Sequence, residues 1–275
     1  MNVLITGAHG TVGTSLVKHL PKQYSLTLLD RVEPPTDHPH ADRETLVADV
    51  TDRDAMDTAV SGMDAIVHLA GDPRVTASYD SVERNNVRGT KVTLDAAAEN
   101  GVRSVVFASS NHAVGRYETE HAPQLYDSSY ELTVDHTSPV RPDSDYGASK
   151  VAGEAWMRLY AERHSMQCYS LRIGSVRSDP YDHPYGDAER AVSRGETTRG
   201  SEEYARLAAR MKCTWLSQSD LAHLVACCLD DTTVEYETFY GVSGNEHTWF
   251  DLSHARETIG YDPKENGHAW TEPPQ

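Results

Sequence analysis

The feature that most constrains the fold is an alternation of short apolar runs with helical patterns over residues 1–175. Most neighbouring runs are far enough apart for a helix to lie between them. Such crossovers join parallel strands, and a parallel sheet is buried on both faces. The sequence therefore predicts an α/β fold, a Rossmann-type doubly wound parallel sheet. The predicted strands are 3–5, 26–29, 45–47, 65–69, 105–107 and 168–173.

Helical patterns are clearest over residues 11–20, 52–60, 81–100 and 144–164. Ser144 is a suitable N-cap and Gly101 a suitable stop signal.

No change in composition divides the chain, so we expect one structural unit. In it, we expect residues 1–175 to form the Rossmann-type domain and residues 176–275 to form a small C-terminal lobe. Between residues 176 and 209 the pattern dissolves, which predicts a long inserted loop that is either a substrate lid or a solvated insertion.

The charge balance excludes several kinds of partner. The 42 acidic residues outnumber the 25 basic ones and give a net charge of −17, which repels nucleic acid and anionic membranes. No apolar run approaches the roughly 18 residues of a membrane span, and we expect a soluble, cytoplasmic protein. Scattered carboxylates are typical of proteins from salt-accumulating halophiles, with an ordinary acidic cytosolic protein as the alternative.

The cysteines and histidines do not form a recognisable metal motif. Cys168, Cys213 and the neighbouring pair 227–228 lack CxxC spacing, so we expect reduced thiols and no metal site. His38 and His40 lie among prolines and acids, where a solvated loop is expected.

Three glycines, Gly7, Gly10 and Gly13, follow the first predicted strand and open the first predicted helix. A dinucleotide site lacks side chains where the backbone turns sharply, where it approaches the pyrophosphate and where helix and strand pack together. The N–H groups at the start of the helix then face the phosphates. This context indicates a dinucleotide cofactor.

Asp30 ends the second predicted strand, where its carboxylate can accept hydrogen bonds from the adenosine ribose and would repel a 2′-phosphate. The position favours NAD over NADP. Arg31 follows directly and leaves open either stacking on adenine or contact with a phosphate.

Tyr146 and Lys150 are four positions apart and therefore share one helix face. An ammonium group there would lower the pKa of the phenol from about 10 and favour a phenolate that removes a proton from a substrate hydroxyl. The pair predicts a nicotinamide-dependent dehydrogenase.

These motifs resemble, in their order, those of the extended short-chain dehydrogenase/reductase family over nearly the whole chain. The resemblance also rests on Asp49, on Asn86 in Asn-Val-Arg-Gly-Thr and on the serines that end the fifth predicted strand. It implies Tyr146 as general base, Lys150 as ligand of the nicotinamide ribose and Ser110 as the residue that orients the substrate hydroxyl. The NAD-binding residues that it implies are Gly7, His9, Gly10, Thr11, Val12, Gly13, Asp30, Arg31, Asp49, Val50, Leu69, Ala70, Gly71, Asn86, Tyr146, Lys150 and Ile173.

Three segments, 109–112, 172–175 and 210–217, are similar to uronate dehydrogenases and more loosely to haloarchaeal NAD-dependent glucose-6-phosphate dehydrogenases. The resemblance implies oxidation of sugar C1 to a lactone, with a hexuronate as first choice and glucose 6-phosphate as the alternative. Arg210 would bind the anionic group, and its guanidinium fork suits a carboxylate or a phosphate. The implied substrate-binding residues are Ser110, Asn111, His112, Tyr146, Ser175 and Arg210.

Other functions stay open at this point. Segment 176–209 is longer than its counterpart in the uronate enzymes, and its arginines, Arg190, Arg194, Arg199 and Arg206, would suit a phosphate. A nucleotide-sugar epimerase or dehydratase would use the same motifs, and an NAD-sensing regulator would keep the fold without the chemistry. By resemblance we also expect a homo-oligomer, a dimer or larger.

Overall fold

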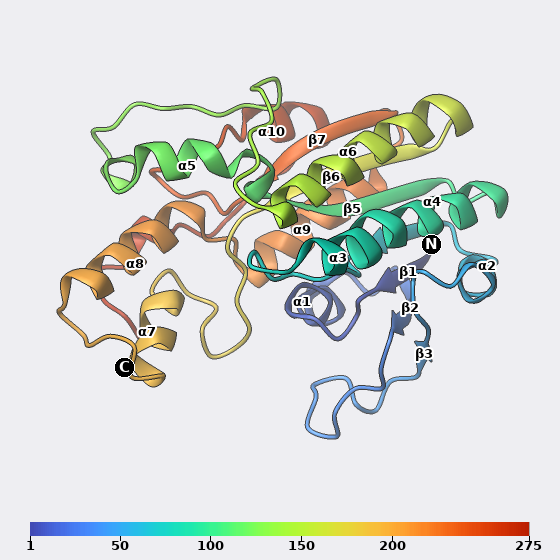
Figure 1. Cartoon of the computed structure of the whole chain (residues 1–275), viewed down its shortest axis with the longest axis horizontal. Helices are drawn as coiled ribbons and strands as arrows, with labels where there is room; N and C mark the ends of the chain where they lie inside the picture. The colour runs from blue at the N-terminus through green and yellow to red at the C-terminus, as the bar shows by residue number, and fades with distance from the viewer. Residues whose placement is uncertain (275) are drawn as a thin grey trace.

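A seven-stranded sheet with the order β3-β2-β1-β4-β5-β6-β7 forms the centre of the computed structural model, which describes residues 1–274. Every neighbouring pair of strands is parallel. The order reverses between β1 and β4, and ligands of doubly wound folds bind beside this point. Figure 1 shows the helices on the two faces of the sheet. The strands are β1 Asn2–Thr6, β2 Ser25–Asp30, β3 Thr45–Val47, β4 Ala65–His68, β5 Ser104–Ser110, β6 Gln167–Ile173 and β7 Tyr236–Gly241.

The predicted fold class is confirmed, and β1 to β6 coincide with the predicted strands to within a few residues. Strand β7 was not predicted. It pairs with β6, and only its last four residues are buried. Because Glu237 and Thr238 interrupt its apolar run, the sequence pattern is that of an exposed segment.

Helices cover both faces of the sheet, and the four predicted helices lie within a few residues of their expected bounds, whereas α5 Gly115–His121 was not predicted. The predicted helix 81–100 is three consecutive pieces, α3, a π-helical stretch Glu83–Arg88, and α4. Ser144 caps α6 through a hydrogen bond from Gly147 N, and Gly101 has a φ of +70° after α4. The helices are α1 Thr11–His19, α2 Arg53–Val60, α3 Tyr79–Val82, α4 Gly89–Glu99, α5 Gly115–His121, α6 Asp145–His164, α7 Gly186–Ser193, α8 Glu202–Thr214, α9 Gln218–Asp230 and α10 Ser253–Ile259.

Two cores form because alternate residues of each strand point to opposite faces of the sheet. Helices α1 and α9 pack on one face, where Val3 and Ile5 of β1 are fully buried. Helices α2, α4 and α6 pack on the other, where Leu4 is fully buried. These layers fix the carboxyl ends of the strands, where the candidate site lies.

Segment 176–209 is not the loop that the sequence predicted. It contains α7 and the start of α8, which lie to one side of the sheet in Figure 1. Ala188 of α7 and Tyr204 and Ala208 of α8 form a small core of their own. The apolar positions are sparse and separated by arginines, so their periodicity is weak in the sequence, and it is packing between the two helices that fixes them.

No helix within residues 1–274 is long and apolar enough to cross a membrane. All four cysteines are free thiols. The division of the chain at residue 175 stays a prediction.

Candidate active site

The glycine turn forms a cradle between β1 and α1. Gly7 has a φ of +69°, and a Cβ on Gly13 would lie 2.5 Å from the carbonyl oxygen of Ala8. Helix α1 has no side-chain cap, and within the described residues the backbone N–H groups of Thr11, Val12 and Gly13 have no hydrogen-bond partner. The start of this nine-residue helix therefore has the donors that a pyrophosphate needs. These residues fit a dinucleotide.

Asp30 and His9 lie together at the end of β2. The Asp30 carboxylate accepts hydrogen bonds from His9 N at 3.0 Å and from Arg31 N at 2.8 Å, so its position beside the turn is fixed. His9 Nδ1 is buried and has no partner in residues 1–274, which leaves a polar atom for a ligand. Arg31 itself is exposed.

The segment after β2 is a largely exposed loop, as expected, but its two histidines are not solvated. His38 Nε2 lies 3.2 Å from Thr14 Oγ1, and His40 Nε2 lies 3.2 Å from Thr14 O. His40 is only 7% exposed. The segment folds back on α1 because its imidazoles find polar partners there, a tertiary contact that local composition does not reveal.

Asp49 and Val50 follow β3 at the same edge of the sheet. Burial opposes ionisation of Asp49, but hydrogen bonds from Thr51 and the charge of Arg84 together lower the pKa of this carboxyl. Arg84 Nη2 lies 2.7 Å from Asp49 Oδ2. Val50 is buried against Gly89.

Asn86 holds the segment after β4 in place. Its Oδ1 accepts a hydrogen bond from Asp72 N at 2.6 Å, and its Nδ2 donates to Asp72 O and to Ser149 Oγ. A Cβ on Gly71 would lie 2.8 Å from Asn86 Oδ1, so only glycine fits there. Leu69 and Ala70 pass beside the glycine turn, where a Cβ on Gly7 would contact Ala70 N at 2.9 Å.

A cavity of about 630 Å³ opens at the carboxyl ends of β5 and β6. All the residues that the sequence assigned to the substrate line it, namely Ser110, Asn111, His112, Tyr146, Ser175 and Arg210. Thr11 of the glycine turn also lines it, so the cavity adjoins the dinucleotide cradle. Ile173 ends β6 directly before the cavity wall at Gly174.

Tyr146 and Lys150 lie on α6 as predicted, but their electrostatics differ from the expectation. Lys150 Nζ donates to Ala108 O at 2.8 Å and lies 5.6 Å from the centre of the Tyr146 ring. Burial raises the pKa of Tyr146, which a hydrogen bond with the Ser110 hydroxyl opposes. Burial also lowers the pKa of Lys150 to about 8. The expected lowering of the tyrosine pKa by Lys150 is therefore not found, because the ammonium faces a backbone carbonyl.

His112 is held by Asp143, a residue that the sequence analysis missed. Its Nδ1 lies 2.7 Å from Asp143 Oδ2, which leaves Nε2 available to a ligand. Burial disfavours the ionised Asp143, but the bond to His112 outweighs it and lowers the pKa of this carboxyl. The side chain of Ser175 is fixed by a hydrogen bond between Ser175 Oγ and Thr214 Oγ1 at 2.9 Å.

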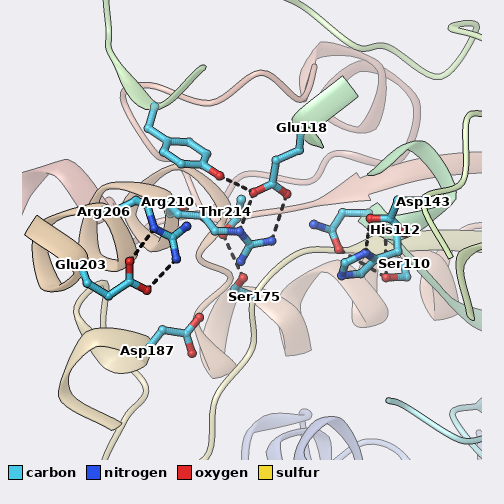
Figure 2. Close-up of polar contacts among 12 residues, drawn as sticks. Ser110, His112, Glu118, Asp143, Ser175, Asp187, Glu203, Arg206, Arg210 and Thr214 are labelled. Atoms are coloured by element: carbon cyan, nitrogen blue, oxygen red, sulfur yellow. Dashed lines mark hydrogen bonds and ion pairs between the residues drawn. The ribbon is translucent and has the colours of Figure 1, made fainter. Parts of the chain in front are cut away.

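Arg210 reaches the cavity from α8, but its guanidinium already has a partner. Nε lies 2.5 Å and Nη2 lies 3.0 Å from the two carboxylate oxygens of Glu118, as Figure 2 shows. The sequence analysis missed Glu118, which lies 92 positions away on α5.

Two more arginines line the cavity, Arg177 and Arg190. Asp187 accepts two hydrogen bonds from Arg177, at 2.6 and 2.7 Å, and one from Arg190 at 3.4 Å. Of the four arginines expected to suit a phosphate, Arg190, Arg194, Arg199 and Arg206, only Arg190 lines the cavity. Arg199 pairs with Glu189, and Arg206 pairs with Glu203.

The model of the NAD dependent epimerase/dehydratase family matches residues 3–237. The chain is 39% identical to the NAD-dependent glucose-6-phosphate dehydrogenase of Haloferax volcanii, over 98% of this chain and 95% of that protein. It is 31% identical to an L-arabinose 1-dehydrogenase (NAD(P)+) of the same organism, over 96% of both chains. A crystal structure of uronate dehydrogenase from Agrobacterium tumefaciens superposes with a TM-score of 0.73 and 27% identity, over 100% of this chain and 90% of that one.

Proposed function

The chain belongs to the NAD-dependent epimerase/dehydratase family, and we propose that it oxidises C1 of an anionic pyranose to a lactone, with a hexuronate as the substrate. Its relatives already identify it as an NAD-dependent oxidoreductase that acts on sugars. The relative from Haloferax volcanii also supports the interpretation of the acidic composition as that of a halophilic protein. The observation that carries the proposal is that Arg210 and Tyr146 line one cavity.

In this proposal each residue of the cavity has one task. Tyr146 removes the proton of the C1 hydroxyl, while Ser110 and Asn111 hold that oxygen. The glycine turn and Asp30 would hold NAD, which would supply the hydride acceptor for C1. His112, fixed by Asp143, and Ser175 bind the other hydroxyls, which rejects sugars that lack one and leave a buried partner unpaired.

The charge of the cavity favours a single negative charge on the substrate. Arg177, Arg190 and Arg210 face the two carboxylates of Glu118 and Asp187, which leaves one positive charge. A hexuronate carboxylate matches it. Asp179, the acid that lines the cavity itself, pairs with Lys18 at 2.8 Å.

Glucose 6-phosphate is the second candidate. The relative at 39% identity is named for it, and Arg190, with a single contact at 3.4 Å, has donors left for a phosphate. An epimerase would instead keep NAD bound and would not produce NADH in a net reaction.

The test is NADH formation in molar KCl with glucuronate, galacturonate, glucose 6-phosphate, glucose and arabinose. We expect the highest kcat/KM with a hexuronate. Turnover of only glucose 6-phosphate would support the second candidate. Turnover of only neutral sugars would show that the substrate has no anionic group.

Tyr146→Phe tests the general base. The variant keeps the ring and its packing and loses the hydroxyl, so we expect a fall in kcat of at least about 100-fold, the lower range of general-base effects. Because burial raises the pKa of Tyr146, wild-type NADH formation should increase with pH as the phenolate becomes populated. Wild-type activity in Tyr146→Phe would refute this role.

A further inference from the structure

The carboxylate of Glu118 accepts three hydrogen bonds from the groups around it. Besides the two bonds from Arg210, its Oε1 accepts a hydrogen bond from Tyr126 Oη at 2.8 Å. Its side chain is 13% exposed, and that of Arg210 is 20% exposed. Such a partly buried bidentate pair is screened by salt less than a surface pair. Glu118 is therefore a fixed negative charge beside the cavity.

Glu118 also limits what Arg210 offers to a ligand. Glu118 occupies Nε–H and one N–H of Nη2, while Nη1 and the second N–H of Nη2 have no hydrogen-bond acceptor within residues 1–274. Arg210 thus offers a ligand the fork at the end of its guanidinium, but Glu118 already compensates its charge. The 3₁₀ turn Asn111–Val114 leads directly into α5, so the chain that supplies Asn111 and His112 also positions Glu118.

We propose that Glu118 is a specificity-determining residue, which sets the charge of the anion subsite so that it accepts a monoanionic carboxylate and disfavours a dianionic phosphate. This inference rests on the proposed function. A phosphate carries about −1.5 to −2 at neutral pH, and each added negative charge faces the carboxylate of Glu118.

The test is the preference of Glu118→Gln for glucose 6-phosphate over glucuronate, as the ratio of the two kcat/KM values. Glutamine keeps the size and one acceptor for Arg210 and removes the charge. We expect this ratio to rise at least about 10-fold, through KM rather than kcat. The ratio of glucose to arabinose should not change, because neither sugar is charged.

Glu120→Gln is the matched control. Glu120 lies on the same helix and pairs with Arg116 and Arg141, neither of which lines the cavity, and its variant changes the net charge equally. It should leave the ratio unchanged. An equal rise in both variants would show an effect of overall charge and overturn the proposal, as would an unchanged ratio in an active Glu118→Gln.

A second measurement tests the proposal without the variant, in case Glu118→Gln does not fold. Inorganic phosphate and acetate are compared as competitive inhibitors of the wild-type enzyme at equal ionic strength. Stronger inhibition by acetate supports the proposal, and stronger inhibition by phosphate overturns it. If the wild type instead prefers glucose 6-phosphate, the hexuronate proposal fails, while the shift between Glu118→Gln and Glu120→Gln still tests Glu118.

Discussion

Two arginine–glutamate pairs with the same chemistry lie in different regions of the molecule. Arg172 of β6 and Glu154 of α6 are buried behind the sheet, with side chains 3% and 7% exposed, and make two hydrogen bonds at 2.9 and 2.8 Å. Arg210 and Glu118 make a similar fork at the cavity, where they are 20% and 13% exposed.

The pairs differ in what remains available around them. Tyr240 Oη accepts a hydrogen bond from Arg172 Nη1 at 2.9 Å, and Ser109 Oγ donates to Glu154 at 2.6 Å, so the buried pair is closed by its neighbours. In the second pair Arg210 keeps Nη1 and one N–H of Nη2 without an acceptor among residues 1–274. A buried donor without a partner is costly, so an arginine with unpaired N–H groups at a cavity indicates a ligand-binding role. An ion pair whose groups are all hydrogen-bonded indicates a structural role.

Removing one partner should separate the two regions most clearly. Glu154→Ala leaves the Arg172 charge buried and uncompensated, so we expect a loss of about 3–5 kcal/mol in the free energy of unfolding. Glu118→Ala should lose less than half of that, because the cavity lets solvent reach Arg210. Urea midpoints in molar KCl measure both, and equal losses would break the distinction.

Lys150 sharpens the comparison, because it is a buried charge with no carboxylate partner among the described residues. It is 6% exposed and donates one hydrogen bond, to Ala108 O. Burial lowers its pKa from 10.5 to about 8, which corresponds to about 3 kcal/mol of destabilisation at pH 7. We expect Lys150→Met to raise the urea midpoint at pH 7 and to abolish NADH formation.

The sign of the pH dependence follows from the same shift. Between pH 8 and 10.5 the folded state holds fewer protons at Lys150 than the unfolded chain, so the wild type gains stability relative to Lys150→Met as the pH rises. The advantage of the variant should therefore be complete below pH 8 and shrink above it. A constant difference from pH 7 to 10 would show that burial of Lys150 costs nothing.

The smallest effect is expected for an exposed pair. Arg158 and Glu162 lie 4.0 Å apart on α6 with both side chains 63% exposed. Glu162→Ala should not change the urea midpoint measurably, since water and salt screen such pairs. A shift similar to that of Glu118→Ala would mean that burial does not explain the difference between the regions.

The fold was predictable where the signal was local. Apolar runs and helical periodicity marked β1 to β6 and most helices between them, whereas β7 was missed because Glu237 interrupts its pattern. Helices α7 and α8 were missed because they bury only a few residues, mainly against each other. The motifs predicted residues that the structure brings to one cavity, but they did not predict Asp143 and Glu118, since neither lies in a motif.

The sequence by itself determined the doubly wound parallel sheet, the glycine turn at its edge and the chemical types of the groups at the strand ends. These depend on residue spacing, which strand and helix geometry convert directly into structure. Only the tertiary structure decided the partners of those groups. It placed Lys150 on a backbone carbonyl, His112 on Asp143 and Arg210 on Glu118. Such pairings join residues 31 to 92 positions apart, and they depend on how helices pack around the sheet rather than on any local pattern.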